Sequence, residues 1–515
     1  MNNHPPSQQA PSQQAAWQDA PWLARHYGAV LLAVVLVKLA MAWTLPITGD
    51  EAYFLIWGQH PDLGYYDHPP MVGWWLSLIL PLSEHPLAIR APGILVSMAP
   101  ALAILLLWRR EDPVRARLAS LIALFMPLFF IAVLTATDTP LILFSLLATG
   151  LLWQALRTGA AHWFLLGGLA LGLAFLSKYF AVLLGIAFGL HILLFARQHW
   201  RGLLLVILGV LPAVAVNLYW NWGNCWYNVM FNIVNRHGDG GFDPGNWLTY
   251  ALLLIYLFTP WLLWFYARQW RALGAGIRRH RLAVFLSAGL IPLLVFALLA
   301  PFKSIGLHWL AAFAPFLLLP ALFLGVRALA ISAWLSGGLA LVHATVLLTI
   351  ALMPVEWLER HDRYPDAVFY LAPQALAEVV NAYDPDWPVF TRSYSRSAVL
   401  AYYAGREVGV FGPGSHYGRQ DDLLTDFRAL DGANLLYVPV RGELDPAHVE
   451  PFFEEVRVRT VEVRGIEWSL AEGHGFDYAA YHEQVLQPVL ARYYDFPAWL
   501  PEGRCAFTDR YANRE

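Results

Sequence analysis

The residues best suited to chemistry are acids that stand at the ends of long apolar runs. Asp50 and Glu51 directly follow the first such run, and Asp138 opens a later one. An ionised side chain at the edge of a bilayer is costly unless it has a partner or a task. A carboxylate in reach of a hydroxyl can act as a general base, so these three acids are candidate catalytic residues. The alternative is that they cap external helices, where the helix dipole favours negative charge.

Lysine is rare in this chain, which contains 3 lysines and 31 arginines. Two of the lysines, Lys178 and Lys303, interrupt apolar helices on the same predicted side of the membrane as the acids. Cations placed beside a leaving phosphate stabilise the charge that develops as a bond breaks. We therefore predict that Lys178 and Lys303 bind a phosphate, with Arg236 and His68 in support. The alternative is that both lysines extend along apolar surface to the membrane interface.

An aromatic and polar segment follows the first acids. Candidates to contact a sugar or an acceptor are Tyr53, Tyr65, Tyr66, Asp67 and, further along the chain, Asn221. Aromatic belts at membrane interfaces have the same composition, and asparagines also stabilise ordinary external loops. In Asp67-His68-Pro69-Pro70 the prolines restrict the backbone. His68 is then a phosphate contact, a metal ligand beside Asp67, or an interfacial histidine. A divalent cation therefore stays open, and no other cofactor is predicted.

The composition requires a polytopic membrane protein. Hydrophobic residues make up 58% of the chain and charged residues only 14%, unlike a soluble enzyme. We expect a polar cytoplasmic tail over residues 1–26 without a cleavable signal, and about 11–13 helices over 27–353. The apolar runs lie near 28–46, 91–108, 118–134, 139–156, 161–177, 179–196, 202–222, 247–267, 282–300, 305–326 and 329–353, with a shorter one at 71–83.

Basic residues predict the orientation, because short loops rich in Lys and Arg stay in the cytoplasm. With the amino terminus inside, thirteen basic residues of the connections before residue 354 fall on the cytoplasmic side. Only Arg90, Lys178, Arg236 and Lys303 fall outside. The first external loop, residues 47–90, then carries the acidic and aromatic segment. The chemistry is predicted to face the outside of a bacterial inner membrane, in the periplasm.

Residues 354–515 have ordinary polarity and are enough for one small soluble domain. Strand-like runs at 389–392, 407–411, 435–440 and 456–463 alternate with helical stretches at 373–383 and 421–430, which predicts an α/β domain. An odd number of crossings places this domain in the periplasm. The only two cysteines, Cys225 and Cys505, are both predicted to be external. A disulfide and two unpaired thiols are both compatible with that placement.

Five motifs occur in a fixed order along the chain. They are Gly49-Asp50-Glu51-Ala52-Tyr53, Gly64-Tyr65-Tyr66-Asp67-His68-Pro69-Pro70, Thr137-Asp138-Thr139-Pro140, Leu176-Ser177-Lys178-Tyr179 and Asn217–Asn221. Together they resemble the bacterial branch of the dolichyl-phosphate-mannose protein mannosyltransferase family (family 39), a broad group that includes the lipid A aminoarabinose transferase. The resemblance covers about residues 28–353, and more weakly the tail. It implies a GT-C fold whose cavity takes an isoprenoid-phosphate sugar.

Carried over by position, the resemblance assigns Asp50 as the catalytic aspartate of the first external loop, Glu51 as its neighbour and Asp138 as the second external acid. Asp67 and His68 stand where the aminoarabinose transferase has Glu and Lys before a proline. This departure matters, because a lysine there carries a permanent charge whereas histidine is charged only when it is protonated. Lys178, Lys303 or Arg236 would then supply the permanent charge.

These observations predict an integral inner-membrane glycosyltransferase with a C-terminal soluble α/β domain. It would move a sugar from a polyprenyl-phosphate donor to an acceptor hydroxyl on the periplasmic side, with inversion and with Asp50 as general base. The partners would be that donor, a lipid or protein acceptor and the bilayer, with no nucleic acid. One competing function is a non-catalytic sensor whose external domain binds a ligand, which would leave the Asp-Glu and Asp-His-Pro-Pro segments unexplained. The other is a transporter or flippase of a lipid-linked anion, which predicts charges near helix midplanes and repeat symmetry. Only Lys38 fits that pattern, and no repeat is evident.

Overall fold

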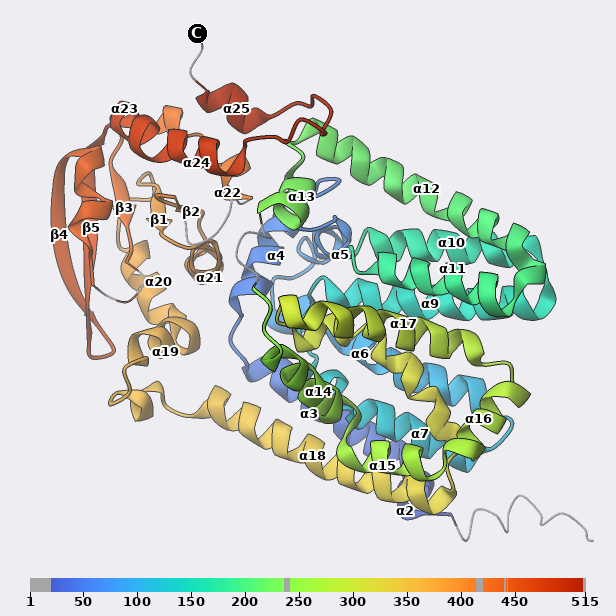
Figure 1. Cartoon of the computed structure of the whole chain (residues 1–515). Coiled ribbons are helices and arrows are strands. Elements are labelled where there is room, and N and C mark those ends of the chain that lie inside the picture. The colour runs from blue at the N-terminus through green and yellow to red at the C-terminus, as the bar shows by residue number, and fades with distance from the viewer. Residues whose placement is uncertain (1–19, 236–240, 414–419, 440, 442, 513–515) are drawn as a thin grey trace, which may run out of the picture. The chain divides into compact units, whose positions relative to one another are not determined.

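Helices dominate the structure, and a small sheet occurs only near the C-terminal end (Figure 1). The computed structural model describes residues 20–235, 241–413, 420–439, 441 and 443–512. A helical membrane protein with a C-terminal sheet domain is therefore confirmed. The described chain divides into two compact units. Unit one contains residues up to Met41, Gly93–Val133 and Asp243–Val346, and unit two contains Ala42–Pro92, Leu134–Phe242 and Leu347–Glu515.

Unit one is built almost entirely of helices. Its elements are α2 (Trp22–Arg25), most of α3 (Tyr27–Thr44), of α6 (Pro86–Trp108) and of α18 (Val326–Leu352), α7 (Pro113–Phe125), α8 (Pro127–Ile131), α14 (Gly245–Phe258), α15 (Pro260–Arg268), α16 (Trp270–Arg279) and α17 (Ala283–Leu299). The axes of α14 and α15 meet at 85°. Thr259 separates them with a positive φ of 63°, and Pro260 opens the second helix. Proline is tolerated at the first helical position, because the N–H that it lacks would have no partner within the helix there.

The apolar run 305–326 differs from the expected continuous helix. It forms the short 3₁₀ segments η4 (Leu307–Leu310), η5 (Ala314–Leu317) and η6 (Leu319–Phe323). Pro315 and Pro320 lie within this run, and each removes a backbone donor that an α-helix requires. Hydropathy alone does not register this effect, because the apolar side chains continue through the break.

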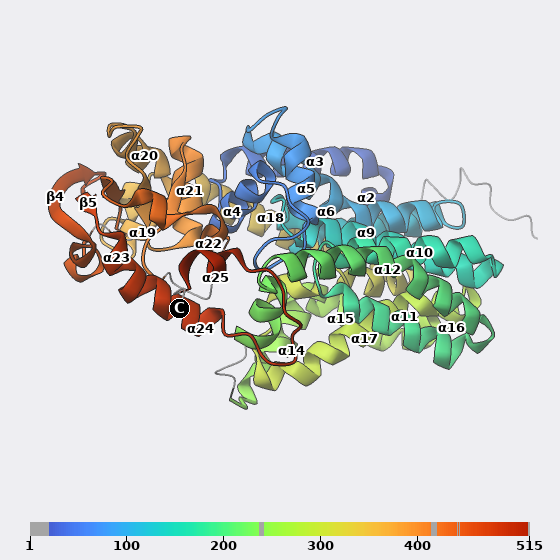
Figure 2. The ribbon, with the colours of Figure 1, turned by 90° about the horizontal axis from the view of Figure 1, so that it is seen from above.

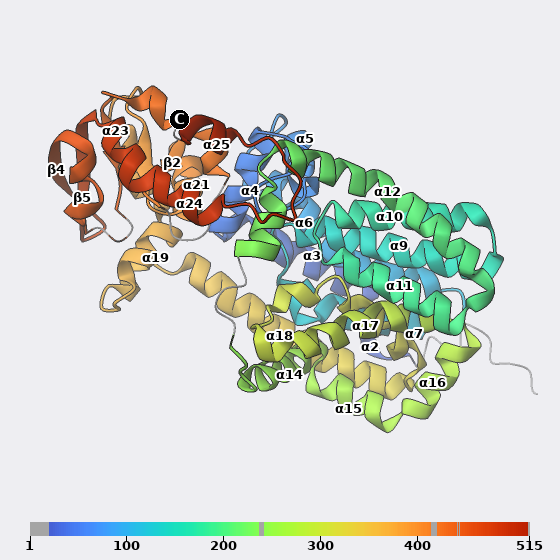
Figure 3. The same ribbon diagram turned by 45° about the horizontal axis from the view of Figure 1, so that its top comes forward.

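The helical part of unit two places four helices side by side, as Figures 1 and 3 both show. They are α9 (Asp138–Thr158), α10 (Ala161–Phe175), α11 (Ala181–Phe195) and α12 (Trp200–Gly223). Helices α10 and α12 approach closely through glycines. A Cβ added to Gly168 would lie 2.2 Å from the Val206 carbonyl oxygen, and one added to Gly209 would lie 2.6 Å from that of Leu165. Small residues of this kind let helix backbones approach in membranes.

The sheet of unit two has the strand order β2-β1-β3-β5-β4. Its strands are β1 (Val389–Thr391), β2 (Val408–Val410), β3 (Leu435–Tyr437), β4 (Phe453–Val463) and β5 (Ile466–Phe476). Strand β1 runs parallel to both β2 and β3, whereas β5 is antiparallel to β3 and β4. The long β4–β5 hairpin forms one edge (Figure 2). All four expected strand regions are occupied, and β5 is an addition.

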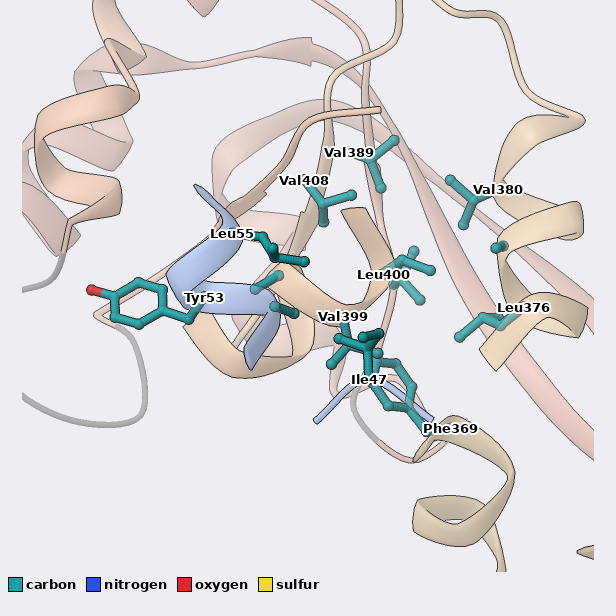
Figure 4. Packing of buried hydrophobic residues seen from close by; sticks show 14 of the residues in the cluster. Ile47, Tyr53, Leu55, Phe369, Leu376, Val380, Val389, Val399, Leu400 and Val408 are labelled. Carbon is teal, nitrogen blue, oxygen red and sulfur yellow. The ribbon is translucent and has the colours of Figure 1, made fainter. Parts of the chain in front are cut away.

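Helices α4 (Gly49–Gln59) and α5 (Met71–Ile79) belong to the first loop, and α19 (Tyr364–Leu371), α20 (Pro373–Asn381) and α21 (Tyr394–Ala404) belong to the C-terminal part. One hydrophobic core joins these segments. It contains Ile47 and Leu55 of the loop together with Val389, Val399 and Leu436 of the C-terminal part. Figure 4 shows Ile47 and Leu55 among the aliphatic side chains of the C-terminal part. The first loop is therefore part of the folded C-terminal core.

Six helices are long and apolar enough to cross a membrane in the described part of the chain, or seven if the bent pair α14 and α15 counts as one span. The six segments are Tyr27–Thr44, Pro86–Trp108, Asp138–Thr158, Arg197–Gly223, Ala283–Phe302 and Val326–Leu352. Shorter apolar helices, such as α10 and α11, occupy other expected runs. The total of 11–13 crossings and the domain boundary at residue 353 stay predictions.

Candidate active site

Glu51 forms a buried ion pair with Arg90. The guanidinium Nε lies 2.7 Å from one carboxylate oxygen and Nη2 lies 2.8 Å from the other. The remaining N–H groups of Arg90 donate to the carbonyls of Ala42, Leu45 and Pro46. Carbonyls at the end of a helix lack an intrahelical partner. Arg90 therefore closes the end of α3 and fixes Glu51 at the start of α4.

The start of α4 is fixed a second time by a capping box. The Thr48 hydroxyl accepts a hydrogen bond from the Glu51 backbone N–H at 3.3 Å, and the Glu51 carboxylate accepts one from the Thr48 N–H at 3.3 Å. Such reciprocal caps satisfy two backbone donors that a helix start leaves open. Glu51 is thus committed to holding the loop, and its predicted catalytic role stays a prediction that the geometry does not favour.

Asp50 has the opposite surroundings, because its side chain is exposed. It lines a pocket of about 420 Å³. The other lining residues are Pro46, Ile47, Thr48, Gly49, Tyr370, Leu371 and Ser395. Within this pocket Asp50 is the one carboxylate among the lining side chains. It can therefore accept a proton from a hydroxyl that enters the pocket.

Asp138 and Lys178 form the second ion pair of the site. The Lys178 ammonium lies 2.9 and 2.8 Å from the two carboxylate oxygens of Asp138. The two side chains are only 10% and 16% exposed, so the pair is largely shielded from water. Because an ammonium has three N–H donors, pairing with Asp138 leaves capacity for an anionic oxygen. The sequence predicted these two residues separately, and the structure brings them together.

The Asp67-His68 step contains unsatisfied polar atoms. Nδ1 of His68 lies 3.1 Å from an Asp67 carboxylate oxygen, yet the geometry is not that of a hydrogen bond, and this nitrogen is buried without a partner. The second carboxylate oxygen of Asp67 and Nε1 of Trp57 are also buried without one. The Trp57 and His68 rings are 5.9 Å apart. Buried polar atoms are normally paired, so this group marks a polar site.

Three predicted sugar contacts are buried or hydrogen-bonded within the protein. Tyr65 is fully buried, stacks on Trp57 with ring centroids 4.5 Å apart, and donates its hydroxyl hydrogen bond to the Trp57 carbonyl. The Tyr66 backbone N–H donates to Gln420 at 2.9 Å. Asn221 is also fully buried. These positions favour a structural role, and contact with a sugar stays a prediction for them.

An asparagine network ties the end of α12 to the first loop. The Asn221 side chain accepts a hydrogen bond from the Asn228 backbone N–H at 3.0 Å and donates to the Asn217 carbonyl at 2.9 Å. The Asn228 amide in turn donates to the carbonyl of Tyr66 at 3.1 Å, and the Tyr179 hydroxyl donates to the Asn228 side chain. The backbone of the segment that carries Asp67 is thus held in place by hydrogen bonds from asparagine side chains.

Tyr53 lies between the hydrophobic core and a group of acids. Its hydroxyl accepts a hydrogen bond from the Gln420 N–H at 3.3 Å and points away from the labelled apolar side chains in Figure 4. Burial raises the pKa of this hydroxyl well above its ordinary value, and the carboxylates of Asp67 and Asp421 raise it further. Tyr53 therefore stays neutral and can serve as a hydrogen-bond donor near Asp67.

Cys225 and Cys505 form a disulfide, which resolves the alternatives left open by the sequence. Backbone hydrogen bonds accompany it, from Cys225 N–H to the Arg504 carbonyl and from Arg504 N–H to the Trp222 carbonyl, each at 2.8 Å. Cys225 and Trp226 both have positive φ, 49° and 48°, a conformation that costs energy for residues other than glycine. The bridge holds this unusual turn just before Asn228.

Lys303 and Arg236 are the remaining cations that the sequence predicted to bind the phosphate. Lys303 follows η3 (Ala300–Phe302) in unit one, and Arg236 lies outside the described residues. Lys38 is completely buried and donates to the carbonyls of Phe129 and Phe130 at 2.7 and 2.9 Å, and to that of Ala132. Among the side chains that the structure describes, no group of three or more His, Cys, Asp or Glu residues could hold a metal ion.

Arg90 is the site residue that the sequence reasoning did not select. Its signal was present, because Arg90 is one of only four basic residues that fall outside in the connections before residue 354. Gln420, which supports Tyr53 and Tyr66, carried no such signal. It is distant in sequence and its polar side chain is ordinary for a loop.

Two comparisons of sequence identify similar proteins. Residues 67–220 match the model of the dolichyl-phosphate-mannose-protein mannosyltransferase family. A lipid A galacturonosyltransferase, RgtD of Rhizobium johnstonii, is 33% identical over 181 residues, which cover 33% of this chain. The match spans 38% of the length of that relative, well under half.

Solved structures extend the similarity to nearly the whole chain. ArnT from Cupriavidus metallidurans in the apo state has a TM-score of 0.61 at 16% identity, covering 90% of this chain and 98% of ArnT. The same protein bound to undecaprenyl phosphate gives a TM-score of 0.58 at 15% identity, with 87% and 97% covered. The fold is therefore the GT-C fold of membrane glycosyltransferases. The match to the dolichyl-phosphate-mannose-protein mannosyltransferase family covers residues 67–220, and beyond that segment the likeness is one of fold.

Proposed function

We propose that this protein is an inner-membrane glycosyltransferase that moves a sugar from a polyprenyl phosphate to an acceptor hydroxyl on the periplasmic side. The observation that carries the proposal is the exposed Asp50 carboxylate in its pocket, on a helix start fixed by Glu51 and Arg90. The relatives support the donor class, since the ArnT structure contains undecaprenyl phosphate. They support the reaction class through the galacturonosyltransferase RgtD.

Asp50 acts as general base in this mechanism. Its carboxylate takes the proton of the acceptor hydroxyl while the hydroxyl oxygen forms a bond to the anomeric carbon. The bond from that carbon to the phosphate oxygen breaks on the opposite face, and its electron pair leaves with the polyprenyl phosphate. The anomeric configuration is therefore inverted.

Lys178 is the proposed cation for the leaving phosphate. The phosphate gains negative charge as the bond breaks, so an ammonium beside it stabilises the transition state more than the ground state. Asp138 holds the ammonium in place through two short contacts. Lys303, Arg236 and His68 remain proposed supporting groups.

The periplasmic orientation rests on two independent observations. Basic residues before residue 354 favour an inside amino terminus and an outside first loop. The Cys225–Cys505 bridge belongs to the kind of bond that persists in oxidising compartments. A reporter fused after Pro354 should therefore be active in the periplasm, and one fused within 109–117 or 268–281 in the cytoplasm. A cytoplasmic signal from the C-terminal fusion would reverse the orientation.

The direct test uses the full chain in nanodiscs with a panel of undecaprenyl-phosphate-linked sugars and a lipid A acceptor. The expected result is transfer with an inverted anomeric centre, measured by NMR of the product. Asp50→Asn should lower the rate about 10²- to 10⁴-fold, which is the usual contribution of a general base. Transfer with retention, or wild-type turnover by Asp50→Asn, would contradict the mechanism.

A further inference from the structure

The pocket at Asp50 has two walls of different origin. One wall is the start of α4, from Pro46 to Asp50, and the other consists of Tyr370, Leu371 and Ser395 of the C-terminal part. Tyr370 and Leu371 end α19, and Ser395 lies in the first turn of α21. The base and the second wall are therefore far apart in sequence but share one cavity.

The second wall is held by specific contacts. Arg396 is 8% exposed, pairs with Asp366 and lies over the rings of Phe369 and Tyr370, 4.9 and 5.2 Å from their centroids. A guanidinium over an aromatic face is an attractive contact. Arg396 thereby fixes the ring of Tyr370 at the pocket.

The two walls are also joined to each other. The backbone N–H of Ile47 donates to the Tyr403 hydroxyl at 2.9 Å. A Cβ added to Gly49 would lie 2.9 Å from Cβ of Ser395, so glycine is what allows this approach. The width of the pocket next to Asp50 is thus set by α21.

The pocket begins close to the membrane surface. Pro46 is two residues beyond Thr44, the end of the membrane-crossing helix α3, a distance of at most about 7 Å along an extended chain. Trp43 is 62% exposed at this helix end, and tryptophan favours the interface between membrane and water. The path from the end of this helix to the pocket is therefore short for an acceptor that is anchored in the membrane.

We propose that this pocket is the acceptor subsite and that it takes the saccharide headgroup of a lipid-anchored acceptor. Tyr370 offers an aromatic face to the sugar ring, and the Ser395 hydroxyl offers a hydrogen bond to a sugar hydroxyl. Tyr370, Leu371 and Ser395 then determine acceptor specificity, whereas the donor phosphate binds at Lys178. This inference rests on the proposed function, in which Asp50 takes the proton of the acceptor hydroxyl.

The test measures separate KM values for acceptor and donor, with lipid A in nanodiscs as acceptor and an undecaprenyl-phosphate sugar as donor. Tyr370→Leu should raise the KM for the acceptor about 3- to 10-fold, the worth of one aromatic contact. Ser395→Leu should have an effect at least as large, because it narrows the pocket. The donor KM should stay unchanged in both variants.

Two control variants test whether the effect depends on the aromatic ring of Tyr370 and on its position in the pocket. Tyr370→Phe keeps the ring and should restore most of the acceptor affinity that Tyr370→Leu loses. Tyr478→Leu removes a tyrosine of the same C-terminal part that does not line the pocket, and it should leave both KM values unchanged. Circular dichroism and thermal unfolding of each variant check that it folds.

The outcomes separate this inference from the proposed function. If wild-type protein transfers no sugar from any polyprenyl donor, the proposed function fails. If wild-type protein is active but Tyr370→Leu and Ser395→Leu raise only the donor KM, or neither KM, the acceptor subsite is overturned alone. If a soluble serine- and threonine-containing peptide is a better acceptor than lipid A, and its KM rises in the same variants, the pocket takes a protein acceptor and the lipid-anchored class is wrong.

Discussion

Asp50 and Glu51 are neighbours in sequence with opposite surroundings. Glu51 is 2% exposed, and its carboxylate is held by Arg90 and by the Thr48 backbone. Asp50 is exposed in the pocket. The difference shows how one helix start divides two tasks. The inner acid fixes the backbone, and the outer acid lines the pocket, where we propose that it acts on a hydroxyl.

The same division recurs between the two ion pairs. Every N–H of Arg90 is used within the protein, so the Glu51–Arg90 pair has no capacity for a ligand. The Asp138–Lys178 pair retains that capacity on the ammonium side. Breaking the Glu51–Arg90 pair should therefore lower the free energy of unfolding, and breaking the Asp138–Lys178 pair should lower the rate of transfer.

The largest effect on stability is expected for Arg90→Met. It leaves a buried Glu51 carboxylate and three carbonyls without their partner, which should lower the free energy of unfolding by about 3–5 kcal/mol. Denaturant unfolding of purified protein in detergent measures the change. The matched control is Asp50→Asn, which should stay within about 0.5 kcal/mol of wild type. If Arg90→Met protein were as stable as wild type, the proposed structural role of Glu51, in contrast to Asp50, would be wrong.

Lys178→Met should act mainly on the reaction. We expect a loss of about 2–5 kcal/mol of transition-state stabilisation in donor turnover, the range for removing one partner of a desolvated charge pair. Lys178→Arg should restore only part of the donor turnover, because the planar guanidinium of arginine does not replace the compact ammonium of lysine. The same two changes at Lys303 test its predicted role. Full activity of both Met variants at saturating acceptor would move the phosphate site to Arg236 and His68.

Removing the disulfide is expected to have a comparable or smaller effect. Cys505→Ser should lower the free energy of unfolding by about 2–4 kcal/mol, because the turn at Cys225 and Trp226 loses its covalent restraint. Thermal unfolding with and without reductant measures it, and reductant should have no further effect on the variant. An unchanged unfolding temperature in reduced wild-type protein would show that the backbone contacts alone hold the turn.

The smallest expected effect is that of Thr48→Ala. It removes one half of the capping box and should cost about 1 kcal/mol of stability, with Arg90 still holding Glu51. Thr158→Ala, which removes a hydroxyl that bonds within an exposed helix end, is the matched control. Equal unfolding free energies for the two variants would mean that the capping box adds nothing to the ion pair.

The helical class and four strand regions could be predicted, because apolar length and β-branched clusters are local properties. The strand β5 escaped prediction, since Gly473 and Gly475 and several polar residues interrupt its pattern. The run 305–326 resembled a helix because hydropathy does not record what Pro315 and Pro320 do to the backbone. Hydropathy and residue pattern therefore fail to predict secondary structure where the backbone, and not the side chain, determines it.

The sequence could nominate acids and cations for the candidate site, and their roles stay predictions, but it could not give their pairing. Asp138 and Lys178 are 40 residues apart, and Glu51 and Arg90 are 39 apart; one sequence contains no information on such contacts. The C-terminal wall of the pocket was also hidden, because Tyr370 and Ser395 are ordinary surface-type residues until α19 and α21 pack on α4. Folding, and not residue type, gives them a place beside Asp50.

The bridge between Cys225 and Cys505 also imposes an order on biosynthesis. It joins residues 280 positions apart, so the turn before Asn228 has no covalent restraint until Cys505 has been synthesised and the two thiols have been oxidised. Membrane insertion of α12 therefore precedes final closure of the site by the synthesis of more than half of the chain. Under the proposed orientation, the chain therefore passes through an inserted state in which the bridge is not yet formed.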